Sequence, residues 1–462
     1  MMSTNRILAI VLSGLFGAAA HAGPPDLPGE TPTLTPRIEQ SDLATMSLIE
    51  MIEHGRRIFS TPFTVMDGLG DGPMDSSDPT AFGGRPTLDD NGMFLRVNGL
   101  DSQTCNECHS IVSNATRPPL LGIGGVGGVS TNAFFAVTGV DADDSRNSGF
   151  AELDGGRFIN PPFLFGAGGI ELLGKEMTQD LQALKRQAIA HPGTAVALVS
   201  KGVDFGTLSH DGVEFDYSGV EGIDDDLVLK PFGRKGEFAT VRGFDVAALQ
   251  FHLGLQAVEL VGENVDDDGD GIANEIKVGE LSVLHVHNVL LPPPTDRLRN
   301  DDAIEGMAIF EEIGCSDCHV LEMRTRSRNL SLAFPEVDVD PTVNVYIDLD
   351  LAKKPARIER DAAGGLRINA LSDLKRHDMG AGLAESAGMP LDDLFITARL
   401  WGVADTAPYL HDGRATTLSE AILFHGGEAQ TSRDQFEALL SEDRIKILEF
   451  LRSLKTPRSM AQ

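Results

Sequence analysis

The sequence predicts a mainly α-helical protein made of two similar halves, with long irregular loops and one small β-rich insertion. Three observations support this fold class. The pattern Cys-x-x-Cys-His occurs twice, at residues 105–109 and 315–319. Apolar residues recur at helical spacing around each copy. Between the copies, three consecutive prolines at residues 292–294 must end the preceding helix, and we place the boundary between the halves there.

The first half is predicted as a domain over residues 43–294, after an extended leader at residues 23–42. Its helices are expected, from apolar periodicity, at residues 43–59, 177–190, 244–261 and 280–291. Residues 67–92 are dense in Gly, Asp and Pro, which is typical of an irregular loop. Residues 202–236 are the expected β-rich or loop insertion.

The second half is predicted as a domain over residues 295–462. A short amphipathic helix at residues 307–313 leads into the second Cys-x-x-Cys-His pattern. Residues 432–454 carry a strong apolar face and are expected to close the domain as helices. Residues 158–166 resemble residues 395–402, which suggests that the two halves arose by duplication.

The two repeated patterns account for all four cysteines of the chain, Cys105, Cys108, Cys315 and Cys318. Two thiols three residues apart, followed at once by a histidine, are the attachment pattern of haem c. The thiols add to the porphyrin, and the adjacent histidines, His109 and His319, are the proximal ligands of the iron. A redox dithiol and half a zinc site are the alternatives. The duplication and the lack of any spare cysteine favour two haem groups in two cytochrome c-like domains.

The N-terminus has the features of a secretory signal peptide at residues 1–22. Arg6 precedes an apolar stretch, and Ala20-His21-Ala22 has the small-x-small form of a cleavage site. The apolar stretch is too short to span a bilayer comfortably, and no later run is long enough; an uncleaved anchor is the alternative. We therefore expect a periplasmic protein without a stable membrane span. The formal net charge of −31 argues against nucleic-acid binding.

With these residues described, the chain resembles the di-haem oxidoreductase family of peroxidase-like enzymes, and more distantly the bacterial di-haem cytochrome c peroxidases. The resemblance rests on the second haem pattern, on Leu400-Trp401-Gly402, on residues 407–414 and on residues 417–429. It implies that the second axial ligand of the C-terminal haem follows the His-Asp-Gly motif at His411. That ligand is usually methionine, and this sequence offers His425 at the matching place. A histidine there implies a low-spin electron-transfer centre; the alternative is a surface histidine beside a Gly-Gly turn.

The sequence does not identify the group on the distal side of the first haem. The resemblance implies a glutamate that handles protons there, and Glu176, with Glu171 second, is the candidate from the Glu-Met pair at residues 176–177. Acids that merely start a helix are the alternative for both. His252 is a competing iron ligand, although a lone histidine on an apolar helix face is typical of a protein core. Trp401, the only tryptophan, is expected to pack on a haem.

An acidic loop at residues 264–275 contains Asp266, Asp268 and Asp270 in a D-x-D-x-D-G pattern. Alternate carboxylates of this kind converge on hard cations such as Ca²⁺. Lys277 stands where an EF-hand requires glutamate, so the loop is not an EF-hand. Asn274 or Glu275 is available to complete a different calcium site, and a solvated acidic turn is the alternative.

Taken together, these patterns predict a periplasmic di-haem c oxidoreductase with peroxidase-like activity. The C-terminal haem is expected to pass electrons to a catalytic N-terminal haem. A non-catalytic di-haem electron-transfer cytochrome is the alternative, and an enzyme that oxidises a partner protein is a third possibility. The expected partners are an electron-donor protein or small cytochrome, and peroxide or another small oxidant.

Overall fold

The computed structural model describes residues 31–70, 103–109, 160, 162–294, 300–384 and 393–457. The predicted signal peptide, most of the loop at residues 67–92 and part of the leader lie outside these residues.

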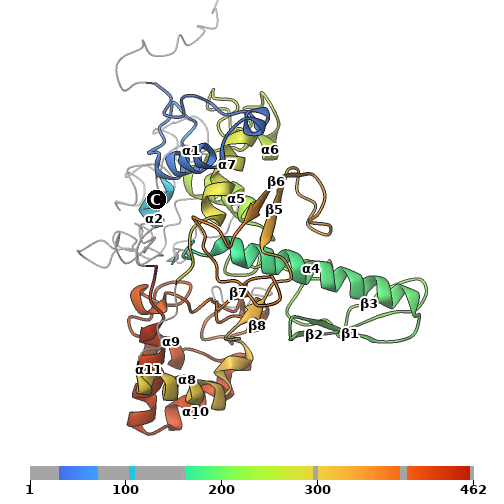
Figure 1. Ribbon diagram of the computed structural model, residues 1–462, viewed down its shortest axis with the longest axis vertical. Helices are drawn as coiled ribbons and strands as arrows, with labels where there is room; N and C mark the ends of the chain where they lie inside the picture. The colour runs from blue at the N-terminus through green and yellow to red at the C-terminus, as the bar shows by residue number, and fades with distance from the viewer. Residues whose placement is uncertain are drawn as a thin grey trace, which may run out of the picture.

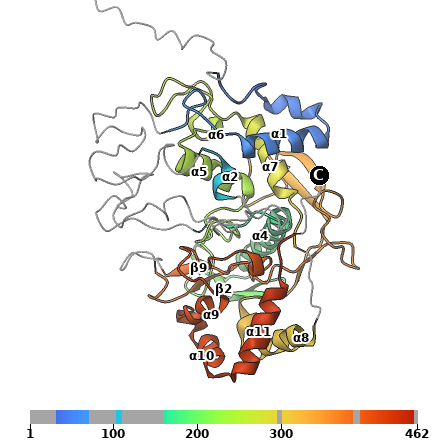
Figure 2. The same ribbon diagram turned by 90° about the vertical axis from the view of Figure 1, so that its left-hand side faces the viewer.

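One group of helices forms one end of the molecule (Figure 1): α1 (Leu48–Ser60), α5 (Val241–Leu253), α6 (Val258–Val261) and α7 (Val278–Val289). A second group forms the other end: α8 (Asp301–Glu312), α9 (Leu418–Leu423), α10 (Gln430–Ala438) and α11 (Ser441–Ser453). The long helix α4 (Ala167–Ala190) crosses between the two groups (Figure 2).

Helix α1 forms most of the helix predicted at residues 43–59, after a short 3-10 turn at Gln40–Ala44. Ser47 caps it, and its side chain and that of Glu50 bond reciprocally to backbone N–H groups. Helix α7, predicted at residues 280–291, runs against α1. A side chain at Gly55 would overlap the backbone of Val283, so glycine lets the two helices approach closely.

Helix α4 begins ten residues before the predicted start at residue 177. The stretch Gly166-Ala-Gly-Gly reads as a loop, because glycine is a poor helix former. In the structure Gly166 takes a left-handed conformation, with φ of 75°, and the helix starts at the next residue. A side chain at Gly168 would overlap the carbonyl of Val289. Packing against α7 therefore outweighs the low helix propensity of these glycines.

The predicted β-rich insertion is a three-stranded antiparallel sheet, of which the order is β1–β2–β3. It begins before residue 202, and its strands are β1 (Val196–Ser200), β2 (Val203–His210) and β3 (Phe215–Asp216). The first strand alternates buried and exposed side chains because only one face of the sheet packs on α4. The chain up to residue 236 then continues mainly as turns.

The closing helices predicted at residues 432–454 are α10 and α11. Helix α11 packs against α8, the helix that leads into the second Cys-x-x-Cys-His pattern. A side chain at Gly306 would overlap the backbone of Lys446, so glycine is required where the two helices cross. Their shared core is small and contains Phe310, Phe450 and Leu451.

The second half also contains short strands that the sequence analysis did not predict. They are β4 (Met323–Arg324), β5 (Asn329–Ala333), β6 (Val345–Asp350), β7 (Arg367–Ile368), β8 (Arg376–Asp378) and β9 (Leu394–Ile396). They form three two-stranded sheets, β4–β7, β5–β6 and β8–β9. Leu330, Leu332 and Ile368 from these strands belong to the same hydrophobic core as α1, α4 and α7. The fold is therefore mixed rather than mainly α, and the larger core crosses the predicted boundary at residue 295.

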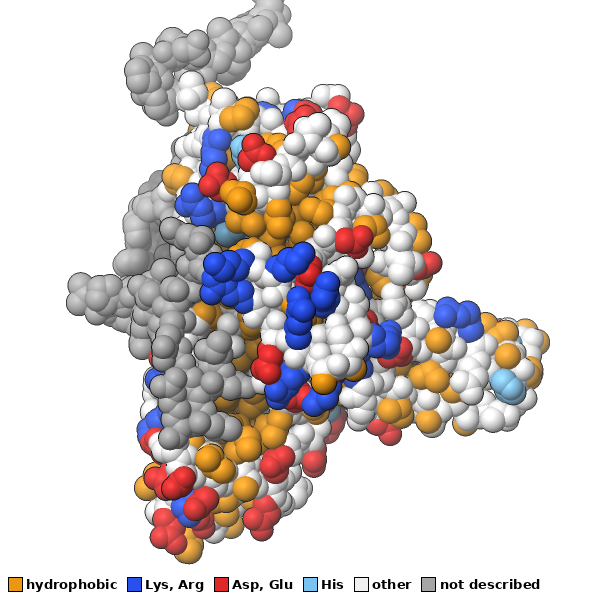
Figure 3. Space-filling view, in the orientation of Figure 1, with side chains coloured by type: hydrophobic (Ala, Val, Ile, Leu, Met, Phe, Trp, Pro, Cys, Tyr) orange, Lys and Arg blue, Asp and Glu red, His pale blue; other side chains and the backbone are white. Residues whose placement is uncertain are grey.

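Basic side chains gather across the middle of one face, around the segment that carries β7 (Figure 3). Several of the exposed arginines of residues 324–367 pair with acids. Arg324 bonds to Asp361 at 2.9 Å, and Arg326 bonds to Asp180 of α4 at 2.7 Å. These pairs help to hold the segment on α4 and offset part of its positive charge.

Candidate haem sites

The second Cys-x-x-Cys-His pattern follows directly from the end of α8. Asn300 caps the start of that helix, and Gly314, with φ of 80°, turns the chain into the 3-10 turn Cys315–Asp317. The His319 N–H donates to the Cys315 carbonyl at 3.0 Å, which closes the turn. Burial raises the pKa of the Cys315 thiol to about 12. A reactive dithiol requires a lowered thiol pKa, so this environment favours a covalent attachment role over redox cycling.

His319 is held in the orientation of a metal ligand. Its Nδ1 lies 3.0 Å from the carbonyl oxygen of Leu371, and since a carbonyl only accepts, Nδ1 carries the hydrogen. The lone pair of Nε2 is then available to a metal. Burial lowers the pKa of His319 to about 4, against an opposing effect of the Leu371 carbonyl, so the ring is neutral, as a ligand must be.

His425 is held in the same way at the end of α9. Thr417 and Glu420 form a capping box at the start of this helix. The helix ends at Leu423, which leaves the Ala421 carbonyl without a backbone donor of the next turn. The His425 Nδ1 lies 2.8 Å from that oxygen, and burial lowers the pKa of His425.

The two rings lie at the separation expected for the two axial ligands of one iron. Their centroids are 6.5 Å apart, with the ring planes at 51°. An imidazole nitrogen binds a first-row metal at about 2 Å, so two imidazoles on opposite sides of one ion have centroids about 6.3 Å apart. The residues present therefore fit a haem held between His319 and His425.

A second arrangement of possible metal ligands occurs beside this site. One ligand atom from each of Cys318, Asp373 and His377 lies within 4.8 Å of the others. However, His377 uses Nδ1 on Glu428 at 2.7 Å and Nε2 on Asp373 at 2.8 Å. Burial would lower the pKa of His377, but these partners outweigh it and raise the pKa to about 11. A protonated ring with both nitrogens donating has no lone pair for zinc, so the environment favours haem attachment at Cys318.

The first Cys-x-x-Cys-His pattern is attached to the end of α1. It forms the short helix α2 (Cys105–Cys108), capped by Thr104, whose hydroxyl also donates to the Phe59 carbonyl at 3.0 Å. His109 follows, and its N–H donates to the Cys105 carbonyl at 2.8 Å. Both patterns therefore use the same tight turn to bring the histidine back toward the first cysteine.

His109 resembles His319 in its lowered pKa but differs in its hydrogen bonding. Its Nδ1 is buried without a hydrogen-bond partner within the part of the chain that the structure describes. Burial, and then the charge of His252, lower the pKa of His109 to about 4, while the Pro162 backbone acts in the opposite direction. The neutral ring fits an iron ligand.

Two further histidines lie near His109. The effect of His252 on the His109 pKa places that residue of α5 close by. The Phe59 ring lies 6.3 Å from the His109 ring and 5.7 Å from the ring of His287 on α7. His252 was predicted as a candidate ligand but His287 was not, and its only signal in the sequence was its place in a largely apolar helix. The distal group of the first haem stays a prediction.

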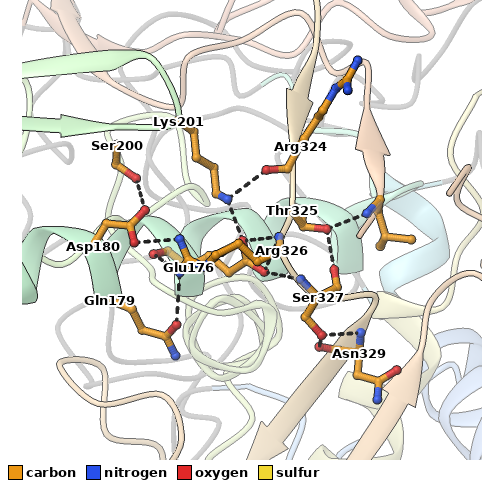
Figure 4. A network of polar contacts seen from close by, with 11 residues as sticks. Glu176, Gln179, Asp180, Ser200, Lys201, Arg324, Thr325, Arg326, Ser327 and Asn329 are labelled. Carbon is orange, nitrogen blue, oxygen red and sulfur yellow. Dashed lines mark hydrogen bonds and ion pairs between the residues drawn. The ribbon is translucent and has the colours of Figure 1, made fainter. Parts of the chain in front are cut away.

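Glu176, the first candidate for proton handling, is fully engaged in a polar network (Figure 4). Its carboxylate lies 2.6 Å from the Lys201 ammonium. It also accepts from the backbone N–H groups of Arg326, at 2.8 and 2.9 Å, and of Ser327, at 2.9 Å. Glu176 thereby joins α4 to the β1–β2 turn and to the chain after β4. These contacts favour a structural anion, and a catalytic role stays a prediction.

Glu171, the second candidate, lies inside the protein with no exposed surface. Its carboxylate pairs with Lys175 at 2.7 Å and with His285 at 2.9 Å, and accepts from the Val241 N–H at 2.9 Å. Burial alone would raise the pKa of Glu171, but Lys175 and His285 outweigh it and lower the pKa. At neutral pH this group is an anion that holds α4, α5 and α7 together.

The two halves meet where residues 160–166 contact residues 399–411. The Asn160 side chain donates to the carbonyls of Pro408 and Leu410, at 2.9 and 2.8 Å. Trp401 is 3% exposed, and a side chain at Gly166 would overlap its ring. The Trp401 Nε1 is buried without a partner among the described residues. The predicted haem contact of Trp401 stays a prediction.

The acidic loop brings its predicted ligands together. One carboxylate oxygen from each of Asp266, Asp268 and Asp270 lies within 4.8 Å of the other two. The nearest buried acid is Glu275, which is 2% exposed.

Comparisons with known proteins support the resemblance. Residues 354–454 match the family model described as "Di-haem oxidoreductase, putative peroxidase". No curated protein matches the chain in sequence. Within the described residues, no helix is long and apolar enough to cross a membrane.

Two solved structures are similar to the chain at low identity. One is hydrazine synthase of Kuenenia stuttgartiensis under xenon pressure, with 13% identity and a TM-score of 0.33, covering 98% of this chain and 100% of that one. The other is a MauG-like protein associated with microbial copper homeostasis, with 15% identity and a TM-score of 0.27, covering 63% of this chain and 88% of that one. TM-scores this low carry no argument. The family match supports the predicted resemblance: residues 354–454, which include Trp401, His411 and His425, are similar to the di-haem oxidoreductase family.

Proposed function

We propose that the chain is a di-haem c-type oxidoreductase with peroxidase-like activity, in which the C-terminal haem passes electrons to the N-terminal haem. The observation that carries the proposal is the pair of neutral, half-buried imidazoles of His319 and His425, whose ring centroids lie 6.5 Å apart. Each has its Nδ1 bonded to a backbone carbonyl, so both Nε2 atoms are available to one iron. When bound, haem supplies one-electron transfer and, where a coordination position is open, reduction of peroxide.

We assign covalent attachment to Cys315 and Cys318 in the second site, and to Cys105 and Cys108 in the first. Two protein ligands on the C-terminal iron leave no position for a substrate, so this site is suited to electron transfer. We therefore propose the N-terminal haem as the one that meets the oxidant.

A continuous series of hydrogen bonds and backbone segments connects the two proximal histidines and supports electron exchange between the two sites. Pro162 lies beside His109, and the next residue, Phe163, accepts a hydrogen bond from Arg399 at 3.4 Å. Leu400 then donates to the Ala370 carbonyl at 3.0 Å. The following carbonyl, of Leu371, accepts from the His319 ring. The two proximal histidines are thus connected by short stretches of backbone and four hydrogen bonds or close contacts.

Arg399 contributes a charged side chain to this connection. Burial lowers the pKa of Arg399 to about 10, and its guanidinium bonds to the carbonyls of Pro231 and Phe163 and lies over the Phe163 ring. A buried cation at the junction is a suitable partner for an acidic haem propionate, and would lower the cost of placing negative charge between the sites.

The contacts of Glu176 and Glu171 favour a structural role for both residues, because their carboxylate oxygens are already paired with cations and N–H groups. If either handles protons during peroxide reduction, it must first exchange these partners. We keep both as the candidate acid/base residues; for Glu176, the stability and peroxidase activity of Glu176→Gln distinguish a structural role from proton handling.

The signal peptide at residues 1–22 supports export to the periplasm, where haem c is attached. The formal charge of −31 is compatible with a basic electron-donor protein or small cytochrome as partner. The proposed oxidant is peroxide or another small molecule. The proximity of His252 and His287 to His109 supports one second candidate, a non-catalytic electron carrier in which the first haem also has two histidine ligands.

Low-temperature EPR of the oxidised protein, with and without cyanide, tests the proposal. A low-spin signal beside a high-spin signal that cyanide converts would support an enzyme with an open first haem. Two low-spin signals that cyanide does not change would support the electron carrier.

The variant His425→Ala tests the axial pair. It is expected to convert one low-spin signal to a high-spin signal that cyanide reverses, because one strong ligand is lost. His191→Ala is the matched control: His191 also ends a helix and lies 3.0 Å from the carbonyl four residues earlier, but is exposed. A His425→Ala protein with both signals unchanged would refute the axial assignment.

A further inference from the structure

We propose that the acidic loop binds one calcium-type cation through four carboxylates, and that the fourth, Glu275, reaches it from the protein interior. The proposal does not depend on the haem function. It extends the D-x-D-x-D-G pattern, because the sequence alone did not distinguish Glu275 from Asn274 as a ligand, nor a cation site from a solvated turn.

The loop backbone holds the three aspartates in one place. Gly269 and Gly271 have φ of 78° and 92°, conformations that side chains disfavour. Asp266 accepts from the N–H groups of both glycines, at 2.8 and 3.1 Å. The chain thereby wraps around its own carboxylates, and one oxygen of Asp268 is buried without a hydrogen-bond partner within the described residues.

Glu275 supplies the independent observation that points to a ligand. It is 2% exposed, and its Oε2 accepts from the Gln256 N–H at 2.7 Å. Its Oε1 is buried and has no hydrogen-bond partner among the described residues. The side chain of Gln256 in turn accepts from the Asp267 N–H of the loop at 3.1 Å. The unpartnered oxygen therefore belongs to a buried carboxyl group that Gln256 connects to the aspartate loop.

Within the described chain, no cationic side chain is found to neutralise these four acids. The guanidinium of Arg37 lies beside the loop, but it bonds to the backbone carbonyls of Asn274 and Glu275 and pairs with Glu280 at 2.6 Å. Lys277 pairs with Glu39. A buried carboxyl without a counter-charge is costly, and a divalent cation between the four acids removes both the repulsion and the desolvation cost.

The ligand set favours Ca²⁺ over other cations. All candidate ligands are oxygens, which hard cations prefer. Ca²⁺ accepts six to eight oxygens in flexible geometry, so water and backbone carbonyls are able to complete its coordination, whereas Mg²⁺ requires a stricter octahedron. Histidine and cysteine, the ligands typical of zinc, are not among the cluster.

The position of Glu275 gives the ion a structural consequence. A side chain at Gly68 would overlap the Glu275 carboxyl group, so the chain after α1 lies directly against it. Two residues later, Gly70 donates to the Leu253 carbonyl at the end of α5. A cation bound to Glu275 would therefore brace the loop against both α1 and α5, the two helices that flank His109.

Calcium titration of the full-length, haem-loaded protein tests the proposal after removal of metal with a chelator. We expect saturable Ca²⁺ binding by calorimetry at one site, with a rise in the thermal unfolding midpoint. Asp268→Asn is expected to abolish both effects. Asp267→Asn is the matched control, because Asp267 is an exposed acid of the same loop outside the pattern, and it should behave like the wild type.

The variant Glu275→Gln tests whether Glu275 binds the cation or is only buried beside it. We expect it to weaken Ca²⁺ binding at least about tenfold, since affinity depends on the number of charged ligands. Without calcium it should unfold at a temperature equal to or above that of the wild type, because it removes a buried, unpaired acid. Unchanged Ca²⁺ affinity in Glu275→Gln would refute the fourth ligand. A wild-type protein that neither binds nor is stabilised by Ca²⁺ would refute the site.

Discussion

Replacing Glu176 by glutamine is expected to destabilise the protein by about 3–4 kcal/mol. The Glu176 and Lys201 side chains are 6% and 8% exposed and lie 2.6 Å apart. Removing one partner of such a buried pair costs about 3–5 kcal/mol, because the other charge stays buried and unpaired. Glutamine keeps one acceptor oxygen and part of the bonding to Arg326 and Ser327, so the lower part of this range applies.

Urea unfolding followed by far-UV circular dichroism measures this loss as a lower midpoint at unchanged slope. Glu449→Gln is the matched control. Glu449 pairs with Arg452 at 3.0 Å, but the Arg452 and Glu449 side chains are 57% and 34% exposed, so the cost should stay below about 1 kcal/mol. If Glu176→Gln is as stable as the wild type and loses peroxidase activity, the structural assignment is wrong and Glu176 is the acid/base residue.

Three further predictions follow from single contacts. Gly306→Ala should cost about 1–3 kcal/mol in urea unfolding, because its methyl group meets the Lys446 backbone; Gly382→Ala, with open space around it, should be neutral. Burial raises the pKa of Asp245 from its ordinary value of 3.8 to about 7, although His285 and Asn288 act in the opposite direction. The stability that its protonated form contributes is therefore lost between pH 4 and 7. Asp245→Asn should remove that part of the pH dependence; an unchanged slope would refute it. Arg399→Leu should slow electron transfer between the haems after rapid reduction, whereas an unchanged rate would exclude the proposed connection.

Local patterns in the sequence were sufficient for the features that depend on neighbouring residues. Both Cys-x-x-Cys-His turns, the helices α1, α7 and α11 and the acidic loop were predicted close to their observed places. Apolar periodicity, capping residues and glycine turns act over a few residues, so they can be read without the fold. The resemblance of the C-terminal part was also present in the sequence, since the motif around His411 and His425 is short and contiguous.

Tertiary structure alone decided the features that join distant segments. Helix α4 starts at glycines because Val289 packs against them, and the short strands β4, β5, β6 and β7 form because they lie on the core around α4. Glu176 became a buried anion only when Lys201 and the chain at residues 326–327 met it. Residues far apart in sequence also determine the distance between His319 and His425, the contacts of Arg399 and the orientation of Glu275. Their energies come from burial and pairing across the fold, which no local pattern records.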